Sequence, residues 1–144
     1  MKRILLEVVV LFCFSLLLTA CAENTAQTVV PLNRPAVPAA YASKTTNPLA
    51  GNADAIAKGK SEFITNCQPC HGPDGNGQGS NVASLNPKPG KLGQDAKALS
   101  SAYMFWRISE GGSFEPFKSQ MPPYKSGLNE EKIWQIISYL VSIK

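Results

Sequence analysis

The sequence predicts a small all-α domain of three main helices joined by long loops. Apolar residues near the C-terminus recur with helical spacing, and no segment shows the alternating pattern of a strand. Prolines, glycines and asparagines gather between the helical segments, which indicates loops. Three helices in about 90 residues give a thin core, and such a domain usually needs a disulfide, a metal or a cofactor for stability.

The N-terminus has the layout of a secretory signal peptide. Lys2 and Arg3 precede an almost unbroken apolar run from Val8 to Leu18, which predicts a signal peptide over residues 1–20. An uncleaved membrane anchor is the alternative. That reading fits less well, because Ile4 to Ala20 contains Glu7 and is short for a span that needs about 20 apolar residues.

Leu18-Thr19-Ala20-Cys21 resembles the lipobox of bacterial lipoproteins. The resemblance implies that Cys21 carries a diacylglycerol and that the mature chain is lipid-anchored at the outer, extracytoplasmic face of the cell membrane. A soluble secreted protein is a further alternative. Cys13 would leave with the signal peptide, so only Cys67 and Cys70 remain in the folded domain. No disulfide framework is therefore available.

Residues 21–53 are predicted to form a lipid-anchored linker. The segment is rich in proline and alanine and has a single aromatic residue, Tyr41, so it offers little apolar surface for a core. A flexible tether is one interpretation. The other is an extended arm along a neighbouring subunit, stiffened by its prolines.

The predicted domain covers residues 54–144. Its first helix runs from Asp54, as N-cap, to Asn66. Residues 72–95 lack periodicity and are predicted to be a long loop. A second helix is predicted from Ala96 to Glu110, closed by Gly111-Gly112.

A loop over residues 113–127 precedes the last helix, which is expected to begin at the N-cap Asn129. Glu130 and Glu131 occupy its first turn, where the helix dipole favours negative charge. Its buried face is predicted from the i, i+3, i+4, i+7 spacing of four residues, namely Ile133, Ile136, Ile137 and Leu140.

The stretch Cys67-Gln68-Pro69-Cys70-His71 carries the chemistry. A structural zinc site needs four ligands, and His71 is the only histidine in the chain. A redox dithiol is expected in a strand–turn–helix context, which is absent from the pattern. Covalent attachment of one haem c explains all three residues, with a thioether at each cysteine and His71 as an iron ligand. Zinc and dithiol readings are the weaker alternatives.

A second axial ligand must come from a methionine, because no other histidine exists. Met104 lies within the second predicted helix, where methionine is most often core filler. Met121 lies in a loop and is followed by Pro122-Pro123, which suits a rigidly held ligand. We therefore predict Met121 as the distal ligand. A His/Met pair raises the reduction potential.

With these residues in view, residues 54–144 resemble the class I cytochromes c. Cys67, Cys70 and His71 match the haem attachment motif, and Met121-Pro122 matches the distal ligand motif. The resemblance implies the small cytochrome c fold, in which the first and last helices cross at a glycine and aromatics. The residues at the matching positions are Gly59, Phe63, Ile136 and Tyr139.

Further expectations follow from the same resemblance. The carbonyl of Pro87 or Pro89 is expected to accept a hydrogen bond from the His71 ring. Arg107 and Trp106 are candidates for contact with a haem propionate, although a surface arginine and a core tryptophan are the simpler readings. The run from Gly72 to Gly77 resembles the turn that follows the motif in small bacterial members, and calcium binding there is disfavoured because no bidentate glutamate follows.

Lipobox, proline-rich linker and single haem domain together are similar to the monohaem lipoprotein subunits of quinol-oxidising complexes such as alternative complex III. The resemblance implies an electron carrier, not an enzyme, that passes single electrons between protein partners in a respiratory or photosynthetic chain. A mainly structural haem subunit is one alternative; a haem sensor or enzyme, if Met121 is not a ligand, is another. Charge is mildly basic without a Lys/Arg run, so nucleic acid is not an expected partner.

Overall fold

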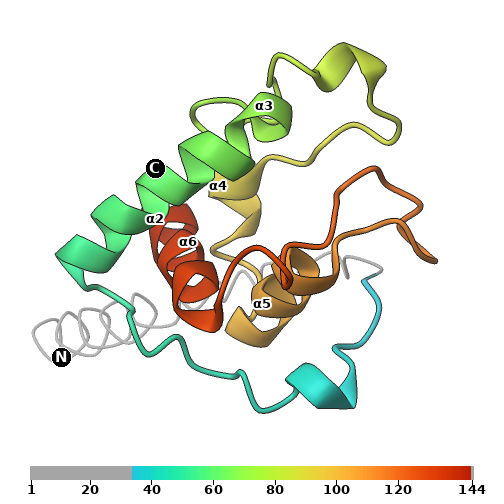
Figure 1. Cartoon of the computed structure of the whole chain (residues 1–144). Coiled ribbons are helices and arrows are strands. Elements are labelled where there is room, and N and C mark those ends of the chain that lie inside the picture. The colour runs from blue at the N-terminus through green and yellow to red at the C-terminus, as the bar shows by residue number, and fades with distance from the viewer. Residues whose placement is uncertain (1–33, 144) are drawn as a thin grey trace, which may run out of the picture. The chain divides into compact units, whose positions relative to one another are not determined.

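The computed structural model describes residues 34–143, and the predicted signal peptide and Cys21 lie outside this range (Figure 1). All regular structure in the described part of the chain is helical, which confirms the predicted all-α class. Within residues 34–143 no helix is both long enough and apolar enough to cross a membrane.

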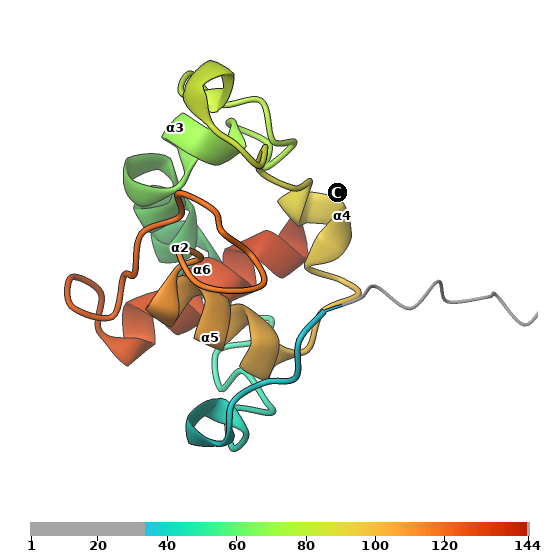
Figure 2. The same cartoon turned by 90° about the vertical axis from the view of Figure 1, so that its right-hand side faces the viewer.

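The first and last helices cross at a glycine, as the sequence predicted. Helix α2 (Ala53–Asn66) meets α6 (Glu130–Ser142) in both views (Figures 1 and 2). A Cβ added at Gly59 would lie 1.9 Å from the Gln135 carbonyl oxygen, so the two backbones touch there. Phe63 is fully buried and its ring centroid lies 5.3 Å from that of Tyr139. Ile136 is also fully buried, which places all four predicted residues at the crossing.

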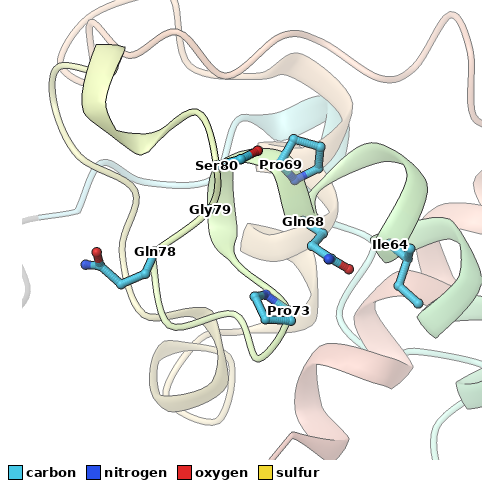
Figure 3. Close-up of a pocket in the computed structure, with 7 residues that line it drawn as sticks. All are labelled: Ile64, Gln68, Pro69, Pro73, Gln78, Gly79 and Ser80. Carbon is cyan, nitrogen blue, oxygen red and sulfur yellow. The ribbon is translucent and has the colours of Figure 1, made fainter.

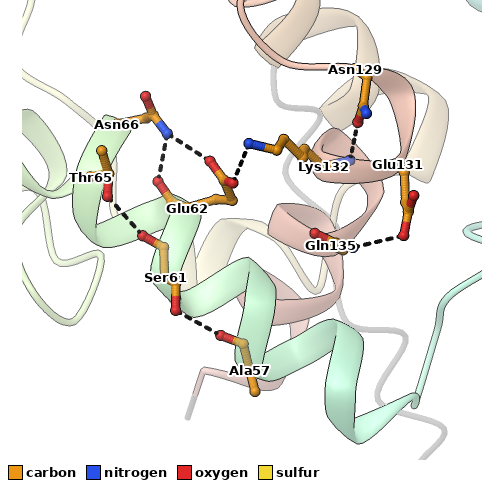
Figure 4. A network of polar contacts seen from close by, with 9 residues as sticks. All are labelled: Ala57, Ser61, Glu62, Thr65, Asn66, Asn129, Glu131, Lys132 and Gln135. Carbon is orange, nitrogen blue, oxygen red and sulfur yellow. Dashed lines mark hydrogen bonds and ion pairs between the residues drawn. The ribbon is translucent and has the colours of Figure 1, made fainter.

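Polar side chains tie the solvent side of this crossing (Figure 4). Lys132 of α6 pairs with Glu62 of α2 at 2.7 Å. Asn66 donates to the same carboxylate at 3.1 Å, and to the Glu62 carbonyl at 2.9 Å. The contacts link α6 to the last turn of α2, directly before the CxxCH motif.

Helix α6 begins where the sequence predicted. The side chain of Asn129 accepts from the Lys132 amide at 2.9 Å and forms the N-cap. The four predicted core residues are all at most 5% exposed: Ile133, Ile136, Ile137 and Leu140. Helix α5 (Ser101–Glu110) packs beside α6, and the Phe105 and Trp134 ring centroids lie 4.6 Å apart.

Two helix starts differ from the prediction. Asn52, and not Asp54, caps α2, because its side chain accepts from the Ala55 amide at 3.0 Å. Helix α5 starts at Ser101 and not at Ala96. Ser100 has an extended backbone and forms the N-cap, because its side chain accepts from the Tyr103 amide at 3.2 Å.

The predicted loop over residues 72–95 is mostly irregular but contains two short helices. They are η2 (Val82–Ser84) and α4 (Leu92–Asp95). The short helix α3 (Gln68–His71) precedes this loop and carries the motif.

Residues 35–52, called the arm below, pack on the domain and include the helix η1 (Ala39–Tyr41). The Tyr41 hydroxyl donates to the Glu110 carboxylate, and its ring lies 6.2 Å from that of Phe105. Lys44 pairs with Glu130 at 2.6 Å. The arm therefore lies across α5 and the start of α6, at the end of the domain away from α3 (Figures 1 and 2).

Asn47 is the buried anchor of the arm, with 8% of its surface exposed. Its amide donates to the Trp134 carbonyl at 3.2 Å and to the Ser138 hydroxyl at 2.8 Å. Its side-chain oxygen accepts from the Leu49 amide at 2.9 Å. The expectation of a linker over residues 21–53 without core contacts is thus wrong for residues 35–52, because polar bonds and a few rings replace the missing apolar surface. The arm lies along its own domain.

Candidate functional site

The CxxCH motif occupies a single helical turn. Cys67 ends α2, and its amide donates to the Phe63 carbonyl at 2.8 Å. The amides of Cys70 and His71 both donate to the Cys67 carbonyl, at 3.1 and 2.9 Å. Residues three and four apart lie on the same side of a helix, so this turn groups the two thiols and the imidazole on one side of α3.

A glycine-rich loop then folds back over α3 and takes up its free carbonyl groups. The amide of Gly77 donates to the His71 carbonyl at 2.8 Å, and that of Asn81 to the Pro69 carbonyl at 2.8 Å. A Cβ at Gly79 would lie 2.3 Å from the Pro69 oxygen, so only glycine permits this approach. The loop holds the motif turn rigidly although it has little regular structure.

His71 is largely buried, and burial lowers the pKa of its imidazole, while the Gly90 backbone raises that pKa to a lesser extent. Its Nδ1 atom is buried and has no hydrogen-bond partner in the described residues. The bond expected from the ring to the carbonyl of Pro87 or Pro89 is therefore not formed. The backbone group that acts on the His71 pKa is instead that of Gly90, the residue after Pro89. A neutral imidazole is the form that ligates a metal.

The environment of the Cys67 thiol argues against a redox dithiol. Burial, and secondarily the neighbouring Cys70 and Glu62, raises the pKa of Cys67 to about 12. A redox dithiol needs a reactive thiolate, and reactive cysteines have lowered pKa values. A thioether carries no charge and suits this site. In the part of the chain described here, no group of three or more His, Cys, Asp or Glu side chains is arranged to hold a metal ion. The donor set thus fits haem c.

Met121 lies in a loop that backbone hydrogen bonds fasten to the end of α5. The Gly112 amide donates to the Met121 carbonyl at 2.9 Å, and the Ser119 amide to the Gly112 carbonyl at 2.7 Å. Beyond Met121, the Tyr124 amide donates to the Ile108 carbonyl at 3.1 Å. Met121 is thus fixed on both sides, and its side chain is partly buried against the core.

Tyr124 connects the Met121 loop to the motif. Its hydroxyl donates to the Asn66 carbonyl at 2.6 Å, directly before Cys67. Burial and then the two cysteines raise the pKa of Tyr124 to about 12. The sequence interpretation missed this residue. Its position three residues after Met121 was the only available signal.

Met104 and Trp106 lie in the core, as the simpler readings predicted, whereas Arg107 is less exposed than a surface arginine. Met104 is 6% exposed within the core, as expected of a core residue. Trp106 is likewise buried. Arg107 is only partly exposed: its guanidinium lies 3.5 Å from the Phe117 ring centroid and donates to the Gly111 carbonyl. Cys21 lies outside the described residues.

Fold and motif turn together define the class of this domain as a c-type cytochrome. A comparison with protein families makes the assignment specific. Residues 54–140 match the family described as cytochrome c oxidase, cbb3-type, subunit III, and the chain belongs to this family. Membership implies covalently bound haem c and an electron-transfer role.

Individual relatives agree. The chain is 33% identical over 86 residues to the cbb3-type cytochrome c oxidase subunit FixP of Rhizobium etli. The match covers 60% of this chain and 29% of that subunit, so the chain spans less than a third of the relative's length.

Solved structures show the same fold at low sequence identity. Cytochrome cL of Methylophaga aminisulfidivorans aligns with a TM-score of 0.54 and 21% identity, covering 81% of this chain and 71% of that one. A reducing HAO-like protein complex of Kuenenia stuttgartiensis aligns with a TM-score of 0.54 and 19% identity. That match covers 67% of this chain and 46% of the other.

Proposed function

We propose that this protein is a membrane-anchored, mono-haem cytochrome c that passes single electrons between protein redox partners. Cys67 and Cys70 would form the thioether bonds, and His71 and Met121 would ligate the iron. The observation that carries the proposal is the tie between the motif turn and the Met121 loop, made by the Tyr124 hydroxyl on the Asn66 carbonyl at 2.6 Å.

Four residues of this chain would hold the cofactor. Haem c supplies an iron that gains and loses one electron. Burial lowers the pKa of the His71 imidazole, which favours the neutral form that ligates a metal. Met121 presents a soft thioether from a loop held by backbone bonds, and such a ligand favours the reduced iron. If His71 and Met121 both ligate the iron, no coordination position would remain for a substrate, which suits electron transfer.

The membrane attachment rests on the lipobox at Leu18-Thr19-Ala20-Cys21. Pro35 is the first residue of the packed unit, so 14 peptide steps separate it from Cys21. A chain of that length reaches at most about 50 Å when fully extended. A lipid at Cys21 would therefore keep the domain within about 50 Å of the extracytoplasmic surface of the cell membrane.

Partners are proposed from the family and from the sequence resemblance. The Rhizobium relative is named as a subunit of an oxidase, and the lipoprotein features resemble subunits of quinol-oxidising complexes. Both support a place in, or beside, a multi-subunit membrane complex of a respiratory or photosynthetic chain. A mainly structural role of this subunit in the same complex would be compatible with electron transfer.

Intact mass of the purified, membrane-derived protein tests the covalent assignments. The expected mass includes one haem and the acyl groups on a chain that begins at Cys21. Cys67→Ala/Cys70→Ala should lose the haem mass and retain the lipid mass. A haem-free wild-type protein would overturn the haem assignment, and an unmodified Cys21 would overturn the anchor.

Optical spectra test the distal ligand. The oxidised wild-type protein should show the far-red charge-transfer band of a methionine–iron(III) bond. Met121→Ala should abolish the band and allow the reduced protein to bind carbon monoxide. Met104→Leu, a buried control of similar volume, should retain the band. Carbon monoxide binding by the wild type without denaturant would instead indicate a sensor or enzyme.

A further inference from the structure

The segment that builds the motif end of the domain is nearly devoid of charge. Between Phe63 and Pro87, a run of 25 residues, Asp74 is the one Asp, Glu, Lys or Arg. The whole chain has 24 such residues in 144, so about four would be expected in a stretch of this length.

Seven residues of this run come together beside the cysteines. A shallow hollow of about 170 Å³ lies over α3 and is lined by seven uncharged residues (Figure 3): Ile64, Gln68, Pro69, Pro73, Gln78, Gly79 and Ser80. We call this the uncharged face. Its volume is below the roughly 300 Å³ at which small-molecule pockets begin, so it does not suit a bound metabolite.

Ile64 is an exposed apolar side chain on the uncharged face. It is 48% exposed, and Val141 at 45% is the other large hydrophobic residue exposed among those described. Gln68 and Pro69 line the hollow and stand between the two cysteines in the sequence. The hollow therefore adjoins the turn that carries both thioether positions.

Glu62 and Lys88, the charged residues on either side of this run in the sequence, both make polar contacts. Glu62 is paired with Lys132 at 2.7 Å and also accepts from Asn66. Lys88 donates to the carbonyls of Val82 and Ala83, at 2.5 and 3.2 Å. Asp74 is exposed and remains as a charge at the rim.

We propose that the uncharged face is the surface on which this cytochrome docks to a redox protein, and that the partner's contact surface is itself uncharged and apolar at its centre. The argument is charge complementarity: a charged partner surface would lose hydration here without gaining an opposite charge. Docking of this kind is weakly steered and insensitive to salt, which suits a partner that the membrane or a complex already holds close. The proposal rests on the proposed electron-transfer function.

Electron self-exchange between two copies of the holoprotein tests the face, with the oxidised protein as the partner for the reduced one. Exchange is measured by NMR line broadening in mixtures of the two forms, from about 10 mM to about 300 mM salt, where the screening length falls from about 30 Å to several ångströms. The wild-type rate is expected to change by less than about twofold over this range. A steep salt dependence would overturn the proposal.

Charged variants locate the contact. Gln78→Lys places like charges opposite each other in the encounter and should slow exchange about two- to fivefold at low salt, with recovery at high salt. Thr46→Lys adds the same charge on the exposed arm, at the opposite end of the domain, and should leave the rate near wild type. Equal slowing by both variants would show an effect of net charge and contradict the assignment of the uncharged face as the contact surface.

The apolar contact is tested by a matched pair. Ile64→Ser should slow exchange at every salt concentration, whereas Val141→Ser, at nearly the same exposure, should not. Equal rates for the two variants would contradict a role for Ile64. Failure of the proposed function is distinguishable, because a protein without haem gives no redox-active sample at all, whereas a failed docking proposal leaves an exchanging protein indifferent to these substitutions.

Discussion

The Met121 loop (residues 113–127) and the arm (residues 35–52) are both irregular, yet the domain holds them in different ways. Backbone groups fasten the loop, through the Gly112 amide to the Met121 carbonyl and the Ser119 amide to the Gly112 carbonyl. Side chains hold the arm, chiefly those of Tyr41 and Asn47. A backbone-held loop tolerates most side-chain changes but not the loss of a glycine at a close approach. A side-chain-held segment depends on the identity of a few residues.

The largest effect is expected at Gly111, where the loop meets α5. Its φ is +70°, and an added Cβ would lie 2.5 Å from the Met121 carbonyl oxygen. Gly111→Ala should lower the free energy of unfolding by about 2–4 kcal/mol, because strain and the backbone clash add. Displacement of Met121 should also weaken the far-red band of the oxidised protein. Denaturant unfolding and the optical spectrum measure both.

Gly127→Ala in the same loop is the control. A Cβ there would lie 4.0 Å from its nearest neighbour, the Tyr124 carbonyl oxygen. The substitution should change stability by less than about 0.5 kcal/mol and leave the band intact. Comparable losses in both variants would mean that the loop is generally intolerant of side chains, against the backbone account.

The next effect is expected from the arm's buried anchor. Asn47→Ala removes two donated bonds, to Trp134 and Ser138, and leaves the Leu49 amide without its acceptor. Stability should fall by about 2 kcal/mol, because the orphaned groups are buried. Thr46→Ala, at the exposed neighbouring position, is the control and should be nearly neutral. A neutral Asn47→Ala would mean that the arm adds nothing to the domain's stability.

These two segments also show how far sequence reasoning reaches. Gly111-Gly112 and Pro122-Pro123 indicate from sequence alone a chain held in a special backbone conformation. The loop, and Met121 as a candidate ligand within it, could therefore be predicted. The same holds for Gly59 and Phe63 at the helix crossing, because close backbone contact needs glycine and aromatic burial follows helical spacing.

The arm had no comparable mark. A segment rich in proline and alanine has the composition of a linker, and Asn47 there looks like any polar residue. Its burial depends on groups more than 80 residues away, since the Trp134 carbonyl and the Ser138 hydroxyl accept its bonds. Tyr124 was missed for the same reason, because its partner, Asn66, is 58 residues distant. Local pattern cannot reveal partners that only the tertiary fold brings together.

A smaller, pH-dependent effect is expected at Tyr41. The pKa of Glu110 is lowered, first by Lys125 and then by the Tyr41 hydroxyl. A lowered carboxyl pKa gives stability that is present above the ordinary value of 4.5 and is lost as the pH falls through the folded-state pKa. Tyr41→Phe should therefore cost about 1 kcal/mol at pH 7 and flatten the acid limb of the stability profile.

The alkaline limb gives an independent check on the same residue. Burial, and then Glu110, raises the pKa of Tyr41 from 10.0 to about 12. The neutral phenol therefore stabilises the fold fully below pH 10, and this contribution is lost as the pH rises toward about 12. Chemical denaturation across both limbs measures the change. Parallel profiles for Tyr41→Phe and wild type would show that the hydroxyl is not coupled to Glu110.

The smallest effect is expected at Lys44, where the arm meets solvent. Its ammonium pairs with Glu130 at 2.6 Å and lies 4.9 Å from the Phe105 ring centroid, but the Glu130 side chain is 67% exposed. Exposed ion pairs contribute little, so Lys44→Met, which keeps the apolar stem, should cost at most about 0.5 kcal/mol, and less in high salt. Lys118→Met is the matched control, because Lys118 and Glu115 are both about 70% exposed, and it should be neutral. If Lys44→Met cost as much stability as Asn47→Ala, the ion pair would hold the arm as strongly as the buried hydrogen bonds. That result would contradict the proposal that buried polar bonds hold this segment.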